Sequence, residues 1–122
     1  LYNEDDITNL KLLEPIPNTP LFNSLQNLRL EKCVVNLSLP CSVYHNHTHG
    51  QKKVLLYYTN VEWKDGWHGE TMFYSEDLNK VEYCSPYTPG RLVLFDGNIP
   101  HALRPQSISA PQLRFTFAMF FS

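Results

Sequence analysis

The sequence predicts a mainly β fold, either a sandwich or a double-sheet jelly roll, and two observations carry this prediction. Over residues 28–122, short runs rich in β-branched and aromatic residues alternate with turn sequences such as Asp96-Gly97. Nine prolines against five glycines in 122 residues also favour many short elements over long helices. We therefore expect one mainly β domain over residues 28–122, preceded by a short irregular or helical segment over residues 1–27.

Eight strands are expected, after one short helix near Leu21–Leu28 that follows a proline-rich stretch. The expected strands are Leu30–Leu37, Val43–His49, Val54–Asn60, Glu70–Tyr74, Val81–Cys84, Arg91–Phe95, His101–Arg104 and Arg114–Phe121. The sequence has no internal repeat, so these strands suit one two-sheet domain better than a repeat architecture.

The last expected strand indicates which sheet face lines a pocket. Side chains alternate along a strand, so its residues fall on two faces. One face carries Arg114, Thr116 and Ala118, and the other carries Phe115, Phe117 and Met119. A long cation among small residues, opposite a phenylalanine stripe, predicts that the first face lines a polar pocket and the second packs outside the barrel.

Composition argues against several classes of protein. The net charge of −2 gives no reason to expect nucleic acid or an anionic membrane as a partner. No apolar run approaches the roughly 20 residues of a membrane-spanning helix. Cys33, Cys41 and Cys84 are odd in number and lack a CxxC spacing, which argues against a disulfide framework or a zinc ribbon. A reducing cytoplasm is the expected location.

The histidines point to a metal site. His45, His47 and His49 would project to one side of a strand, and His101 begins a later strand. A single histidine is more often a surface or core residue than a ligand, and an HxH pair alone is a weak signal. The pair combined with a distant histidine can build a facial three-point site that leaves positions open for substrate and oxygen.

Several motifs in order resemble a known family. They are His47-Thr48-His49, Leu55–Asn60, Trp63, Trp67–Thr71, Phe73-Tyr74, Pro89–Gly97, Pro100-His101 and Arg114–Thr116. Over residues 33–121 the chain resembles the prolyl 4-hydroxylase-like branch of the Fe(II)/2-oxoglutarate-dependent oxygenases. The resemblance implies a double-stranded β-helix, a jelly roll similar to the cupin fold.

The resemblance also implies a ligand set and a cofactor site. In the family, Fe(II) is held by the histidine and the aspartate of an HxD motif and by a distal histidine. The first histidine corresponds here to His47, and the distal one to His101. The far carboxylate of 2-oxoglutarate would pair with Arg114, because a guanidinium offers the bidentate fork that a carboxylate takes. Thr116 and Tyr58 would add hydroxyl donors to the same carboxylate.

The sequence departs from the family at the second metal ligand. His49 stands where the family has aspartate, so the implied ligand set is His47, His49 and His101. A second frame, with His45 as the first ligand, also lacks an acid. An acid from elsewhere, such as Asp96 or Glu70, could complete the site instead.

The resemblance implies a dioxygenase that uses Fe(II), 2-oxoglutarate and O2 to hydroxylate a C–H bond of a peptide or small molecule, with peptidyl proline as the family-level substrate. One alternative is a three-histidine, cupin-type dioxygenase that needs no 2-oxoglutarate, and another is a non-catalytic metal-binding jelly roll. Arg114 discriminates between them, since only the first needs an inward guanidinium. Arg104 is the alternative partner for the far carboxylate of 2-oxoglutarate, but it lies only three residues past His101, too close to cross the barrel.

Overall fold

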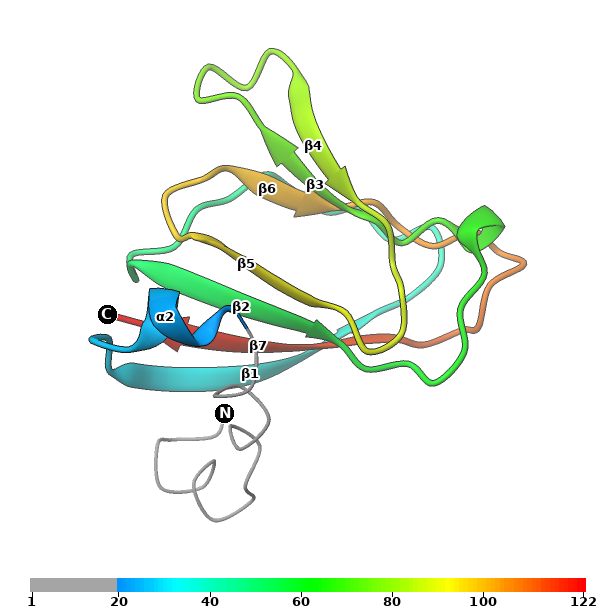
Figure 1. The fold of residues 1–122 in the computed structure, drawn as a ribbon. Coiled ribbons are helices and arrows are strands. Elements are labelled where there is room, and N and C mark those ends of the chain that lie inside the picture. Colours follow the sequence, from blue (N-terminus) through cyan, green and yellow to red (C-terminus); the bar gives the residue numbers. More distant parts are fainter. Residues whose placement is uncertain (1–19) are drawn as a thin grey trace.

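The computed structural model describes residues 20–122 and consists of two facing β-sheets (Figure 1). Its elements are helix α2 (Phe22–Leu25), strand β1 (Leu30–Ser38), β2 (Lys53–Tyr58), the 3₁₀ turn η2 (Asp65–Trp67), β3 (Thr71–Tyr74), β4 (Val81–Ser85), β5 (Leu92–Asp96), β6 (His101–Leu103) and β7 (Arg114–Phe121). A four-stranded sheet has the order β1-β7-β2-β5, and a three-stranded sheet has the order β4-β3-β6. The strand pairings of these two sheets are antiparallel. The predicted mainly β fold is therefore confirmed.

Strand β7 lies between β1 and β2, and its alternating side chains divide the core into two clusters. On its inner face Ala118 and Phe120 pack between the sheets, with Val54, Leu56, Tyr58, Phe73, Tyr87 and Phe95. On its outer face Phe117, Met119 and Phe121 pack with Leu25, Leu30, Cys33 and Leu55. The division of β7 into an inner and an outer face is as predicted from its sequence.

The short helix α2 covers part of the outer face of the larger sheet (Figure 1). Leu25 is buried in the outer cluster, and Leu21 and Leu28 pack against it. Full burial of a leucine contributes roughly 2 kcal/mol, so tertiary packing rather than helix propensity holds this single turn in place. A helix was expected here, and the observed one is shorter than the expected range Leu21–Leu28.

Seven of the eight expected strands are present, and the expected strand Val43–His49 is wrong. Within that segment only His47 forms a β-bridge, with His101 at the free edge of β6. Strand β6 is three residues long, so it offers no ladder for a longer partner. Val43 is 81% exposed, so the segment also buries little apolar surface. It runs beside β6 as a loop with one bridge.

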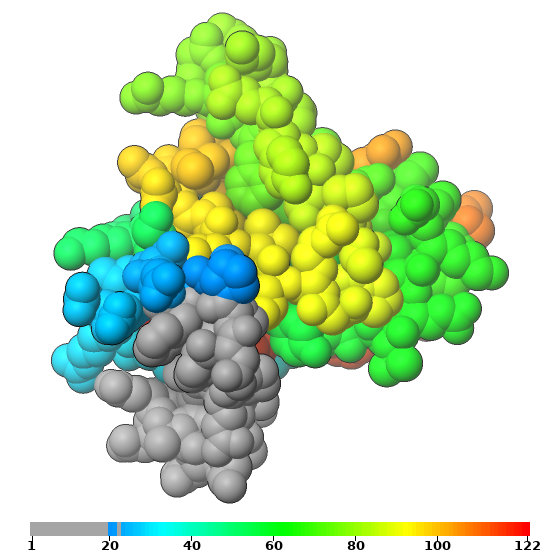
Figure 2. All heavy atoms as spheres, viewed as in Figure 1, coloured from blue at the N-terminus to red at the C-terminus, as the bar shows by residue number. Residues whose placement is uncertain are grey.

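Residues 1–19 lie outside the described part of the chain, so the expected N-terminal segment and its boundary at residue 27 stay predictions. Among the described residues, no helix is long and apolar enough to span a membrane. The hairpin of β3 and β4 projects from the body of the molecule, at the top of Figure 2. The two sheets enclose the space in which the histidines and Arg114 lie.

Candidate metal centre

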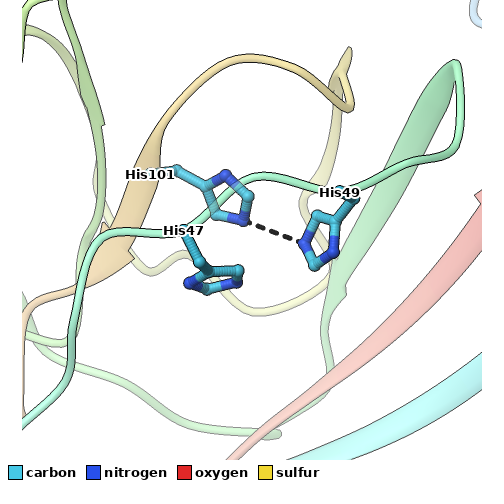
Figure 3. A group of neighbouring side chains, drawn as sticks. All are labelled: His47, His49 and His101. Carbon is cyan, nitrogen blue, oxygen red and sulfur yellow. Dashed lines mark hydrogen bonds between the residues drawn. The ribbon is translucent and has the colours of Figure 1, made fainter.

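Three of the five histidines meet at one point (Figure 3). One ring nitrogen each from His47, His49 and His101 lies within 4.8 Å of the others. The Nε2 atoms of His49 and His101 are 3.2 Å apart. Two ring nitrogens that are each about 2.1 Å from one ion lie about 3.0 to 3.4 Å apart, for angles between a right angle and the tetrahedral angle. This pair therefore already has the spacing of two ligands of one metal ion.

Backbone hydrogen bonds hold the histidine loop against the turn between β5 and β6. The N–H and C=O groups of His47 exchange two 3.1 Å hydrogen bonds with those of His101. The N–H of His49 donates to the carbonyl of Gly97 over 2.7 Å. A Cβ atom on Gly97 would lie 1.9 Å from the carbonyl oxygen of Gln51, so only glycine permits this approach. The Asp96-Gly97 turn thus positions His49.

Second hydrogen bonds orient two of the three rings. The Nδ1 atom of His47 lies 3.2 Å from the carbonyl oxygen of His45, and Nδ1 of His101 lies 2.9 Å from that of Ile99. A carbonyl can only accept, so each Nδ1 carries the hydrogen and each Nε2 presents its lone pair. This is the tautomer in which histidine binds a metal through Nε2.

Two of the imidazoles, those of His49 and His101, are also in the protonation state that a metal needs. Burial, and then the neighbouring His101 and His47, lower the pKa of His49 to about 4. Burial likewise lowers the pKa of His101, which is 6% exposed. Both rings are therefore neutral near pH 7 and need lose no proton to bind a cation.

The other candidate ligands lie elsewhere. His45 is exposed and is not a member of the cluster. Asp96 is half exposed and forms an ion pair with Lys53. Glu70 forms an ion pair with Arg104 over 3.6 Å. Arg104, the alternative partner for the 2-oxoglutarate carboxylate, does not line the cavity. Among residues 20–122, the ligand cluster consists of three imidazoles and no carboxylate.

The histidines line a cavity of about 500 Å³ between the sheets, and Arg114 lines the same cavity. Arg114 is 3% exposed, its Nε donates to the carbonyl of Gly69 over 2.8 Å, and its guanidinium lies 4.8 Å from the ring of Tyr87. Burial lowers its pKa to about 10, so it stays charged at pH 7. No residue in the described range accepts a hydrogen bond from its two terminal nitrogens or pairs with it as an acid. A buried, unpaired guanidinium is costly unless a ligand neutralises it.

Gly69 determines how Arg114 is held. Its φ of +84° favours glycine, and an added Cβ would lie 2.8 Å from the side chain of Trp63 and 3.2 Å from Nε of Arg114. Because the backbone of Gly69 comes so close, its carbonyl oxygen accepts a hydrogen bond from Nε of Arg114. The two terminal nitrogens of the guanidinium are not used in this contact.

The two predicted hydroxyl donors have different surroundings. Thr116 lines the cavity, and its Oγ1 accepts a 3.3 Å hydrogen bond from Asn36, which pairs with it across β1 and β7. Tyr58 is fully buried, and its hydroxyl donates to Thr71 over 2.9 Å. The hydroxyl proton of Tyr58 is thus already used, whereas that of Thr116 is free to turn toward a ligand. Sequence reasoning missed Asn36, which only the register of β1 and β7 brings to Thr116.

Comparison with solved structures places this fold among those of known oxygenases. The chain is similar to a prolyl-4-hydroxylase from Pseudomonas putida, at 22% identity and a TM-score of 0.64, over 95% of this chain and 61% of that one. It is also similar to a Trichoplax adhaerens prolyl hydroxylase in complex with a hypoxia inducible factor peptide fragment. Here the identity is 21% and the TM-score 0.65, over 95% of this chain and 56% of that one. A third similar structure is an oxidoreductase of the 2OG-Fe(II) oxygenase family from Burkholderia pseudomallei. Its identity is 15% and its TM-score 0.68, over 96% of this chain and 57% of that one. No family model and no curated protein matches the sequence.

These similarities establish the fold as the double-stranded β-helix of this class of oxygenase, which confirms the jelly roll expected from the sequence. The chain spans a little over half the length of these three chains. At such low identity the comparison concerns the fold, and any shared chemistry has to be argued from the residues of this chain.

Proposed function

We propose that the protein is an Fe(II)- and 2-oxoglutarate-dependent dioxygenase that hydroxylates a C–H bond. One observation carries the proposal: three imidazoles and one buried guanidinium, which has no acidic partner among residues 20–122, line a single cavity. The imidazoles supply three ligands for a divalent metal, and the guanidinium supplies a partner for a carboxylate. A metal chelator with a second carboxylate would satisfy both groups at once, and 2-oxoglutarate is such a molecule.

The residues of this chain would bind, orient and shield the reactants. His47, His49 and His101 would hold the metal on one side, leaving positions open for other ligands. Arg114 would bind the far carboxylate of 2-oxoglutarate through its terminal nitrogens, with the Thr116 hydroxyl as a further donor. Bound Fe(II) and 2-oxoglutarate supply the oxidising chemistry, in which O2 is activated and the co-substrate is decarboxylated.

A proline-containing peptide is the substrate class that we propose. Two of the similar structures are prolyl hydroxylases, and one of them holds a peptide. The cavity is not closed at the histidines, since His47 is exposed. A substrate could therefore approach the metal from that side, whereas Arg114 lines a buried part of the cavity and is 3% exposed.

A second candidate is a three-histidine dioxygenase that does not use 2-oxoglutarate. The absence of a carboxylate from the ligand cluster of residues 20–122 favours it. Such an enzyme has no need of Arg114, however, and a buried cation that serves no ligand would cost stability. For this reason the 2-oxoglutarate-dependent function is the better supported of the two.

An anaerobic titration with Fe(II) and then 2-oxoglutarate tests the proposal. We expect one iron per chain, and a visible charge-transfer band when 2-oxoglutarate is added. Arg114→Gln should weaken 2-oxoglutarate binding at least ten-fold and spare iron binding, whereas Arg104→Gln, at an exposed arginine outside the cavity, should change neither. Iron binding without 2-oxoglutarate binding would favour the second candidate. If neither binds, both candidates are wrong.

A further inference from the structure

Within residues 20–122, the cavity that holds the proposed metal and co-substrate is lined by basic groups and by no acidic ones. Among the described residues that line it, the ionisable groups of basic type are Lys32, Arg114 and the three histidines. No aspartate or glutamate of the described part of the chain lines it. Arg114 is assigned above to the far carboxylate of 2-oxoglutarate, so Lys32 is the cation that the proposed function leaves without a role.

Lys32 lies at the histidine end of the cavity. It pairs with Phe120 across β1 and β7, and its Nζ lies 4.8 Å from the centre of the Phe120 ring. The ring of His49 also lies against the Phe120 ring, with its centre 4.8 Å away. Lys32 and His49 therefore lie against the same ring, in the lining of the same cavity.

Within the described range Lys32 has no acidic partner. The ion pairs there join Lys53 to Asp96, Lys80 to Glu82 and Arg104 to Glu70. Its chain neighbour Glu31 accepts a hydrogen bond from Gln51 and lies outside the cavity lining. The contact with the Phe120 ring attracts the ammonium but leaves its three N–H donors open to a ligand.

The charge of the complete site favours a further anion. Three imidazoles contribute no negative charge, so a divalent ion held by them keeps both of its charges. The two carboxylates of 2-oxoglutarate can neutralise Arg114 and one charge of the ion. One metal charge and the ammonium of Lys32 then remain in the same cavity, and an anion bound between them would offset their repulsion.

We propose that Lys32 binds a carboxylate of the substrate, so that the molecule hydroxylated at this site is an organic anion. For a peptide substrate, the carboxylate would belong to the reacting residue or to one beside it. The proposal rests on the proposed function, because that function assigns Arg114 to the co-substrate. It extends that function by naming a charge that the substrate must carry and the residue that recognises it.

A matched pair of probes tests this inference. N-acetylproline and N-acetylprolinamide differ in one carboxylate, and their affinities are measured by calorimetry on the full chain with Zn(II) and saturating 2-oxoglutarate. We expect the acid to bind at least ten-fold more tightly than the amide. Lys32→Gln should abolish this preference and leave 2-oxoglutarate affinity unchanged within about two-fold, a readout that a merely structural role would not produce. Lys32→Arg keeps the charge and should keep the preference.

The control is Lys52→Gln, which removes an exposed lysine outside the cavity and should behave as the wild type. Equal affinity for acid and amide in the wild type, or no measurable binding of either, overturns the proposal, as does a preference that survives Lys32→Gln. Chloride that binds as tightly as the acid and with the same sensitivity to Lys32→Gln also overturns it, since the site would then serve an inorganic anion. If 2-oxoglutarate itself fails to bind, the proposed function is wrong, and the effect of Lys32→Gln on the acid-to-amide ratio still decides the role of Lys32.

Discussion

The Nε2 atoms of His49 and His101 face each other across 3.2 Å, although 52 positions separate the two residues in the chain. Because Nδ1 of His101 donates to a carbonyl, Nε2 of His101 accepts, and Nε2 of His49 carries the hydrogen between them. A metal ion would replace that hydrogen, and the proton of His49 would move to Nδ1. The ring contact thus has the spacing of two metal ligands, with one hydrogen in the place that the ion would occupy.

The turn glycine Gly97 should be essential for metal binding. Gly97→Ala would place a Cβ against the carbonyl of Gln51, and the chain would have to move the carbonyl of Gly97 that holds His49. We expect a loss of roughly 1–3 kcal/mol of unfolding free energy and at least a ten-fold loss of metal affinity. Gly50→Ala, at a loop glycine with open space around it, is the control. Equal metal affinity in the two variants would contradict this role.

Gly69 should act on the co-substrate rather than on the metal. Its substitution by alanine would crowd Trp63 and Nε of Arg114, and would strain a backbone with φ of +84°. We expect calorimetry to show 2-oxoglutarate affinity reduced about ten-fold or more, with metal affinity retained. Gly66→Ala, where a Cβ meets open space, should leave both affinities unchanged. A Gly69→Ala variant with normal co-substrate binding would show that Arg114 does not depend on this contact.

His49→Asp should test what the third imidazole contributes. The change keeps a metal-binding side chain but lowers the charge of the site by one unit. We expect metal binding to persist and 2-oxoglutarate to bind more weakly, because its metal-bound carboxylate meets less positive charge. His45→Asp, at an exposed histidine outside the cluster, serves as the control. If both variants have the same affinities, His49 is not a ligand.

The three cysteines should differ in reactivity. Burial raises the pKa of Cys33 to about 12, and Cys33 is fully buried in the outer cluster. Its thiol should stay protonated and unreactive up to strongly alkaline pH while the fold persists. Cys41 and Cys84 are exposed. A thiol titration at pH 8 should therefore count two groups in the native protein and a third after unfolding, and three native groups would contradict the burial of Cys33.

Most of the fold could be predicted because its strands alternate and their turns use specific residues. Arg114–Phe121 was predicted to its exact ends, since its two faces differ so sharply in chemistry. For the segment Val43–His49 the predicted strand was wrong. Its alternating pattern comes from the three histidines, not from apolar residues that a sheet would bury. Its residues fit a strand pattern without a strand's buried face.

The site could be predicted only where a motif marks it. The resemblance supplied His47, His101 and Arg114, and the structure brings them to one cavity. Lys32 carries no motif signal, and its position follows only from the pairing of β1 with β7, which places it opposite Phe120. Strand pairing is a long-range property, so a single sequence does not reveal it.

The most direct test of this account is the anomalous diffraction of a crystal loaded anaerobically with Fe(II) and 2-oxoglutarate. We predict one iron peak within bonding distance of Nε2 of His47, His49 and His101, and the far carboxylate of 2-oxoglutarate at the terminal nitrogens of Arg114. An iron peak that lacks His49, or that lies at Glu70 or Asp96, would contradict the three-imidazole site. Co-substrate bound away from Arg114 would contradict the proposed function.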